Sequence, residues 1–167
     1  MWTGAYESLN FMSVSLPIPF KTSRTHTAKQ EAEALINQLL LFAEKMLVEH
    51  GEFCPYGGYM ADDGKIVHVS ATGSTENPAS KELIELLRRQ FCEGARREEY
   101  RATAVVFDVR IAPPGAANKT DTIQVCVDHK RGYSAEVFFP YNILQDGSLE
   151  LGSTFAQERE NLIFSST

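Results

Sequence analysis

The chain has 167 residues, of which 43% are hydrophobic and 23% are charged, an ordinary composition for one soluble globular domain. Its net charge of −6 and isoelectric point near 5.2 disfavour a nucleic-acid partner, which requires a basic surface against phosphates. The sequence has no run of about 18 apolar residues and no secretion-signal pattern, so we expect no membrane partner. Three cysteines without paired spacing indicate reduced thiols, and we expect a cytoplasmic protein without disulfide, metal or cofactor.

Residues 1–26 are expected to form an extended N-terminal arm ahead of a single α+β domain over residues 27–167. Apolar side chains and two prolines alternate within residues 14–20, which is typical of an arm or an edge strand. A helix over residues 28–50 follows. Thr27 and Gln30 have the spacing of a capping box, apolar residues recur at helical spacing, and Gly51 ends the helix.

Two strands are predicted next, over residues 53–60 and 65–71, because Asp-Gly between two apolar runs is a strong hairpin signal. Asn77 and Pro78 indicate the start of a second helix, which Gly94 ends. Arginines and glutamates are interspersed near the end of this helix. That mixture favours a solvated charged surface over an anion-binding site.

Three strands over residues 101–112, 121–129 and 133–141 form the part around which the rest is organised. The loop Lys130-Arg131-Gly132 predicts a hairpin that pairs Val127 with Ala135, Val125 with Val137 and Ile123 with Phe139. Val125 is therefore expected in the core and Thr122 on an exposed face. A short strand at Leu149 and Leu151 and a final helical turn over residues 154–161 are expected to close the chain.

The expected fold is an α+β two-layer sandwich of order α-β-β-α-β-β-β. A five-stranded, mainly antiparallel sheet carries both helices on one face. This order resembles the roadblock and profilin-like α/β scaffold. Separately, PYGGYMADDG (residues 55–64) and the run DVR…DTIQVCVDH…GYSAEVFFPY (residues 108–141) are similar to a group of small bacterial proteins without assigned activity, which implies a bacterial source.

Few residues predict chemistry. Cys126 and His129 are three apart on a strand and so point to opposite faces, which disfavours a metal site. A nucleophilic pair of Cys54 and His68, or a carboxylate, is the arrangement that a small hydrolase-like enzyme would use. A packed thiol and an unrelated histidine are the favoured interpretation of that pair.

The sequence favours a non-enzymatic protein-interaction module of an adaptor, chaperone-like or immunity-like kind, either a homodimer or bound to another protein. A small enzyme and a small-ligand sensor remain alternatives. The expected interface is the sheet face opposite the helices, because exposed apolar patches usually bind partners. Its predicted members are Val106, Asp108, Gln124, Cys126, Glu136 and Phe138.

Overall fold

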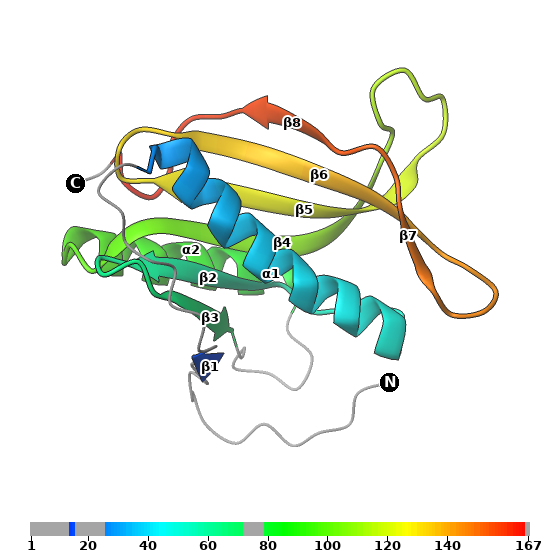
Figure 1. The fold of residues 1–167 in the computed structure, drawn as a ribbon, viewed down its shortest axis with the longest axis horizontal. Helices are drawn as coiled ribbons and strands as arrows, with labels where there is room; N and C mark the ends of the chain where they lie inside the picture. Colours follow the sequence, from blue (N-terminus) through cyan, green and yellow to red (C-terminus); the bar gives the residue numbers. More distant parts are fainter. Residues whose placement is uncertain (1–13, 16–25, 72–78, 166–167) are drawn as a thin grey trace.

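A computed structural model describes residues 14–15, 26–71 and 79–165, and it has the expected α+β class with an antiparallel sheet. Figure 1 shows helix α1 in front of the sheet and helix α2 behind it. The helices are α1 (Ala28–His50) and α2 (Ser80–Arg96). The strands are β1 (Val14–Ser15), β2 (Tyr56–Ala61), β3 (Ile66–Ser70), β4 (Tyr100–Ile111), β5 (Thr120–His129), β6 (Ser134–Ile143), β7 (Leu149–Leu151) and β8 (Phe155–Glu158).

The sheet is open, every pairing in it is antiparallel, and its order is β1-β3-β2-β4-β5-β6-β7, with β8 also paired to β6. The five predicted strands β2 to β6 form its centre. The expectation of a five-stranded sheet is nevertheless wrong, because β1 extends one edge while β7 and β8 extend the other. The expected helical turn over residues 154–161 is also wrong, since residues 155–158 form β8.

The β5–β6 hairpin has the predicted register. Val127 pairs with Ala135, Val125 with Val137 and Ile123 with Phe139. Gly132 adopts φ of 87°, the left-handed conformation that the loop requires. The turn chemistry and the alternation of apolar residues therefore determine this register together.

Helix α1 begins and ends at the predicted residues. The Gln30 backbone N–H donates to Thr27 Oγ1 over 3.2 Å, and the Thr27 N–H donates to Gln30 Oε1 over 2.9 Å. Gly51 closes the helix in the left-handed conformation. The predicted start of α2 at Asn77 and Pro78 lies outside the described residues, as does most of the predicted arm; Val14 and Ser15 pair with β3 at the sheet edge.

The two helices cover opposite faces of the sheet, so the expectation that both lie on one face is wrong. Strand β4 is apolar on both sides and supplies both cores. One set of its residues faces α1: Ala102, Ala104 and Val106. The other set, which includes Val105 and Phe107, packs with α2. The fold is therefore a three-layer arrangement, as expected for a central strand buried on both faces.

Two adjacent glycines in β2 allow both helices to approach the sheet. A Cβ atom on Gly57 would lie 2.9 Å from the Phe91 ring of α2 and 2.7 Å from the Ala104 carbonyl oxygen. A Cβ on Gly58 would lie 2.7 Å from the Leu39 side chain of α1 and 2.9 Å from the Val67 carbonyl oxygen. Any side chain at either position would push a helix away from the sheet.

Gly58→Ala is expected to lower the free energy of unfolding by about 1–3 kcal/mol, the usual effect of overpacking a core. Chemical denaturation of the purified variant would measure the change. Gly152→Ala is the matched control, because its nearest neighbour would be the Pro140 Cβ at 3.4 Å, an ordinary contact. Equal stability of the two variants would contradict the close packing of α1 on β2.

Residues 159–164, here called the C-terminal strap, return from β8 across the α2 side of the sheet. The Arg159 N–H donates to the Ser134 carbonyl over 3.3 Å, and Asn161 Nδ2 donates to the His129 carbonyl over 3.0 Å. Ile163 is 2% exposed and packs with Leu87 and Phe91, so the strap completes the α2-side core.

Candidate functional site

The six residues of the expected interface do not share one face. Val106 pairs with Val125, so Val106 and Asp108 lie on the side that α1 covers. Cys126 pairs with Val105 and faces the opposite side. The prediction of a single surface was wrong because the β4–β5 register could not be derived from a loop of several residues that has no defined turn type.

The other four residues, Gln124, Cys126, Glu136 and Phe138, do lie on the α2 side, but they form no open apolar patch. Cys126 is 2% exposed and Phe138 is 6% exposed. Phe155 of β8 stacks on Phe138 with ring centroids 4.8 Å apart, and Gln157 Nε2 donates to Glu136 over 2.7 Å. The adjoining edge strand β8 thus supplies the side chains that contact Phe138 and Glu136 on this face of the sheet.

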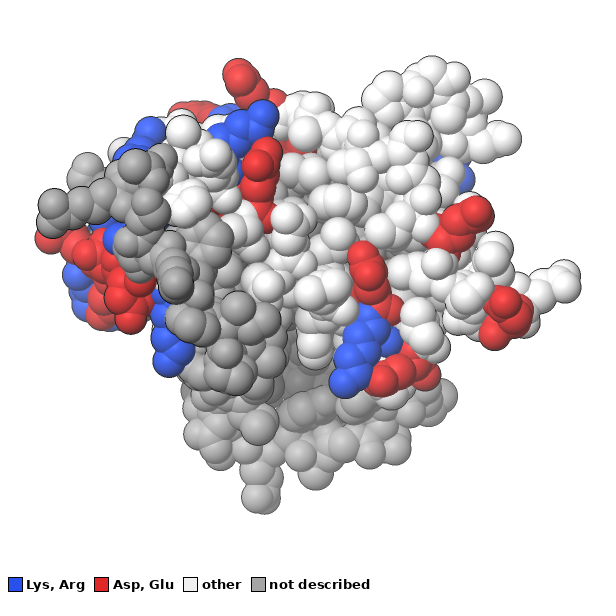
Figure 2. All heavy atoms as spheres, viewed as in Figure 1, with Lys and Arg blue, Asp and Glu red and all other residues white. Residues whose placement is uncertain are grey.

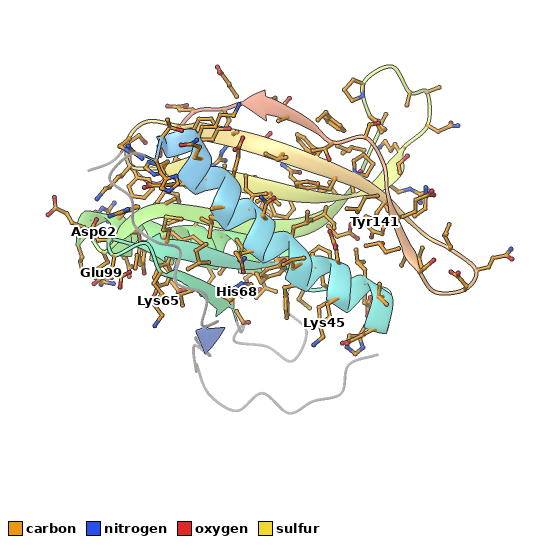
Figure 3. All side chains as sticks on the ribbon, viewed as in Figure 1. Lys45, Asp62, Lys65, His68, Glu99 and Tyr141 are labelled. Atoms are coloured by element: carbon orange, nitrogen blue, oxygen red, sulfur yellow. The ribbon has the colours of Figure 1, made fainter. Side chains whose placement is uncertain are left out.

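The structure does not support a Cys54–His68 pair. Cys54 is exposed and precedes β2, whereas His68 lies in β3 and pairs with Gly58 of β2. Gly58 is four residues after Cys54, and an extended chain rises about 3.3 Å per residue, so Cys54 and His68 are far apart. His68 is half-buried beneath α1, 6.2 Å from the Phe42 ring (Figure 3), and burial lowers its pKa. No hydrogen bond joins Cys54 and His68 in the part of the chain that the structure describes.

A buried polar cluster at the start of α1 was not predicted. The Glu31 carboxylate, 5% exposed, lies 2.7 Å from His129 Nε2 and 3.1 Å from guanidinium nitrogens of both Arg101 and Arg131. A signal for it was present in the sequence, because Glu31 is four residues before Leu35 and so falls on the apolar stripe of α1. A carboxylate at that position requires buried partners.

His129 has no ring nitrogen free for proton transfer to a ligand. Nδ1 accepts the Arg131 backbone N–H over 3.0 Å, so Nε2 carries the proton and donates to Glu31. Burial lowers the pKa of His129, and the hydrogen bond and charge of Glu31 oppose this only in part. Burial would raise the pKa of Glu31, but His129, Arg131 and Arg101 together hold it below its ordinary value. This cluster stabilises the fold and offers no general base.

A second buried carboxylate, Asp128, holds the C-terminal strap on the opposite side of the sheet. It accepts hydrogen bonds from Ser134 Oγ over 2.9 Å, from the Leu162 N–H over 3.3 Å and from Arg159. Every oxygen of Asp128 is therefore occupied by protein groups. Asp128 and Asp108 face opposite sides of the sheet and do not form a carboxylate pair.

A hollow of about 620 Å³ opens at the end of the molecule where α2 leads into β4. It is lined by Asp62, Ala95, Arg96, Arg97, Glu98, Tyr100, Lys130 and Phe164. Asp62 and Glu99 mark this end of the molecule in Figure 3. The volume is in the range of small-molecule sites.

The outward side of α1 carries exposed apolar residues. Leu41 is 61% exposed and Val48 is 52% exposed, and they are seven residues apart. Ala34, seven residues before Leu41, is half-buried and packs at the margin of the α1-side core. We call Ala34, Leu41 and Val48 the α1 outer stripe. Figure 2 shows this side of the molecule: much of its described surface is uncharged, with separate groups of charged side chains among it.

None of the helices in the described ranges is long and apolar enough to cross a membrane. The resemblance to the roadblock and profilin-like scaffold and to small bacterial proteins stays a prediction. Comparison with known proteins finds no family model, no curated protein and no solved structure that matches this chain.

Proposed function

We propose that the protein is a non-enzymatic interaction module of a bacterial cytoplasm and that its partner is a second copy of the chain, bound through the α1 outer stripe. The observation that carries this proposal is the exposure of Leu41 and Val48 on the side of α1 that faces away from the core. Single exposed apolar residues are common, but two large ones aligned on the outward side of one helix are typical of a binding surface.

The spacing of the stripe suits pairing with itself. Residues seven apart lie on one side of a helix, which is the repeat by which two helices pack along their length. A two-fold axis beside Leu41 would place the α1 helices of two copies side by side and antiparallel. Leu41 would then contact Leu41 of the second copy, and Val48 would contact Ala34 of the second copy.

The charges beside the stripe are compatible with this pairing. In the antiparallel arrangement, Lys45 lies near Gln38 of the second copy and Glu44 lies near Asn37 of the second copy. Neither charged side chain therefore meets one of like sign. Lys45 is in addition 3.9 Å from Glu49 on its own helix, which neutralises it locally. Two-fold pairs are the commonest assembly of soluble proteins, which agrees with this choice of partner.

The double variant Leu41→Asp/Val48→Asp tests the proposal. The wild-type protein is expected to have twice the chain mass of 18.6 kDa in light scattering, and the variant the mass of one chain with unchanged circular dichroism. Both side chains are exposed, so the substitutions should not unfold the monomer.

Leu162→Asp is the matched control, because it replaces another leucine that is 44% exposed, on the opposite side of the sheet in the C-terminal strap. This variant should remain a dimer. A wild-type protein that stays monomeric over a broad concentration series would overturn the proposal, as would a Leu162→Asp variant that dissociates equally.

A further inference from the structure

We propose that the hollow between the end of α2, the β2–β3 turn, the β5–β6 turn and the C-terminal strap binds a small anionic ligand with a planar apolar body. The hollow gathers residues that are far apart in the sequence: Asp62, Arg96, Lys130 and Phe164 all line it. The sequence alone showed only interspersed charges near residue 96. The fold adds Lys130 and an aromatic wall beside them.

The lining contains three cationic side chains and two carboxylates. Arg96, Arg97 and Lys130 outnumber the two lining carboxylates, in a chain whose net charge is −6. One of those carboxylates, Asp62, is already neutralised, since it lies 2.7 Å from Lys130 Nζ and 3.8 Å from Arg101 Nε. The Lys130 and Arg101 contacts lower the pKa of Asp62, so it stays ionised and keeps Lys130 at the rim.

Arg96 is the lining cation that is available to a ligand. Arg97 donates to Glu99 over 2.8 Å, and Lys130 is held by Asp62. Arg96 forms no ion pair within the described residues. An arginine can bind a carboxylate or phosphate through two parallel hydrogen bonds, which suits it to anchor either anion.

Aromatic side chains give the hollow an apolar wall. Tyr100 and Phe164 both line it, and the Tyr100 ring packs on the Tyr59 ring with centroids 4.2 Å apart. A Cβ on Gly94 would lie 2.1 Å from the Tyr100 ring, so this glycine creates the space that the ring occupies. A planar ligand body can therefore contact a rigid aromatic surface.

The backbone at the rim is also unusual. Glu98 has φ of 57°, and in the described residues it is the one non-glycine residue with positive φ. Glycine is the usual residue at this position of a helix end, where the Glu99 N–H donates to the Gly94 carbonyl over 3.1 Å. Strained non-glycine residues of this kind concentrate at ligand sites, which agrees with the placement of the hollow.

Four probes separate the contributions to binding. Phenyl phosphate and benzoate carry both an aromatic ring and an anion, inorganic phosphate carries the anion alone, and benzyl alcohol carries the ring alone. We expect at least one of the first two to bind at millimolar or lower concentration by nuclear magnetic resonance titration, with shifts at residues 95–100 and 130, and more tightly than either single-feature probe. The stronger of the two identifies the anion as phosphate or carboxylate.

The variant Arg96→Ala should weaken the best probe by about tenfold or more, through loss of a charge-assisted hydrogen-bonded pair. Arg89→Ala is the matched control, because it removes the same charge from an exposed arginine of α2 that does not line the hollow. Equal weakening by both variants would indicate general charge attraction and overturn the site. Absence of binding by all four probes would also overturn the site. The Leu41→Asp/Val48→Asp variant should bind the best probe as tightly as the wild type, because the hollow does not depend on the proposed dimer.

Discussion

Replacing Glu31 by alanine is expected to lower the free energy of unfolding by about 3 kcal/mol, the effect of removing one partner from a buried ion pair. The carboxylate is 5% exposed and contacts Arg101 of β4, His129 of β5 and Arg131 of the β5–β6 turn. Its loss leaves His129, which is fully buried, without an acceptor for the proton on Nε2. Urea unfolding followed by circular dichroism would measure the change.

The control for Glu31 is Glu33→Ala on the same helix, which removes an exposed carboxylate 3.9 Å from Lys29 and should change stability by less than about 0.5 kcal/mol. Acid should reduce the difference between Glu31→Ala and the wild type. The folded-state pKa of Glu31 lies below its ordinary value of 4.5, so its contribution is present above pH 4.5 and is lost as the pH falls below it. A difference that stays constant down to pH 2 would contradict the ionised pair.

Phe138→Asp is expected to destabilise the protein by roughly 4 kcal/mol, because it removes a large buried ring and places a carboxylate in an apolar site. Phe138 is 6% exposed and stacks on Phe155, so it joins β8 to the sheet. The sequence instead predicted Phe138 as a member of an exposed interface. Unfolding in denaturant, with the milder Phe138→Leu alongside, would measure the loss.

Leu144→Asp is the control for Phe138→Asp, because Leu144 is 44% exposed in the turn between β6 and β7. That variant should retain nearly the wild-type midpoint of unfolding. If Phe138→Asp instead remained folded and lost a partner, Phe138 would belong to an interface and the stacking on Phe155 would not represent the protein in solution.

Local rules were sufficient where the deciding contacts lie close in the sequence. The capping box at Thr27 predicts the first residue of α1, and Gly132 predicts the register of the β5–β6 hairpin. Both depend on hydrogen bonds between residues a few positions apart, and both are present in the structure.

The distribution of helices over the two faces could not be predicted in the same way. An apolar stripe indicates that a helix is buried but not which side of the sheet buries it. The apolar residues on both sides of β4 were a correct signal that this strand is covered on both faces. Thr122 of β5 was nevertheless expected to be exposed, and it is fully buried. The candidate interface failed for a related reason, because β8 extends the sheet beside β6 and the C-terminal strap packs on the α2 side, and both contacts are distant in the sequence.

The position of β4 at the centre of the sheet has a consequence for synthesis on the ribosome. Helix α1, the β2–β3 hairpin and α2 all emerge before β4. Both helices bury their apolar sides mainly on strands that are translated later. The nascent N-terminal half can therefore form only part of each core, and the rest forms when β4 to β6 are released. Because the contacts that complete both cores join distant parts of the chain, we expect slow folding and dependence on chaperones that shield the two helices.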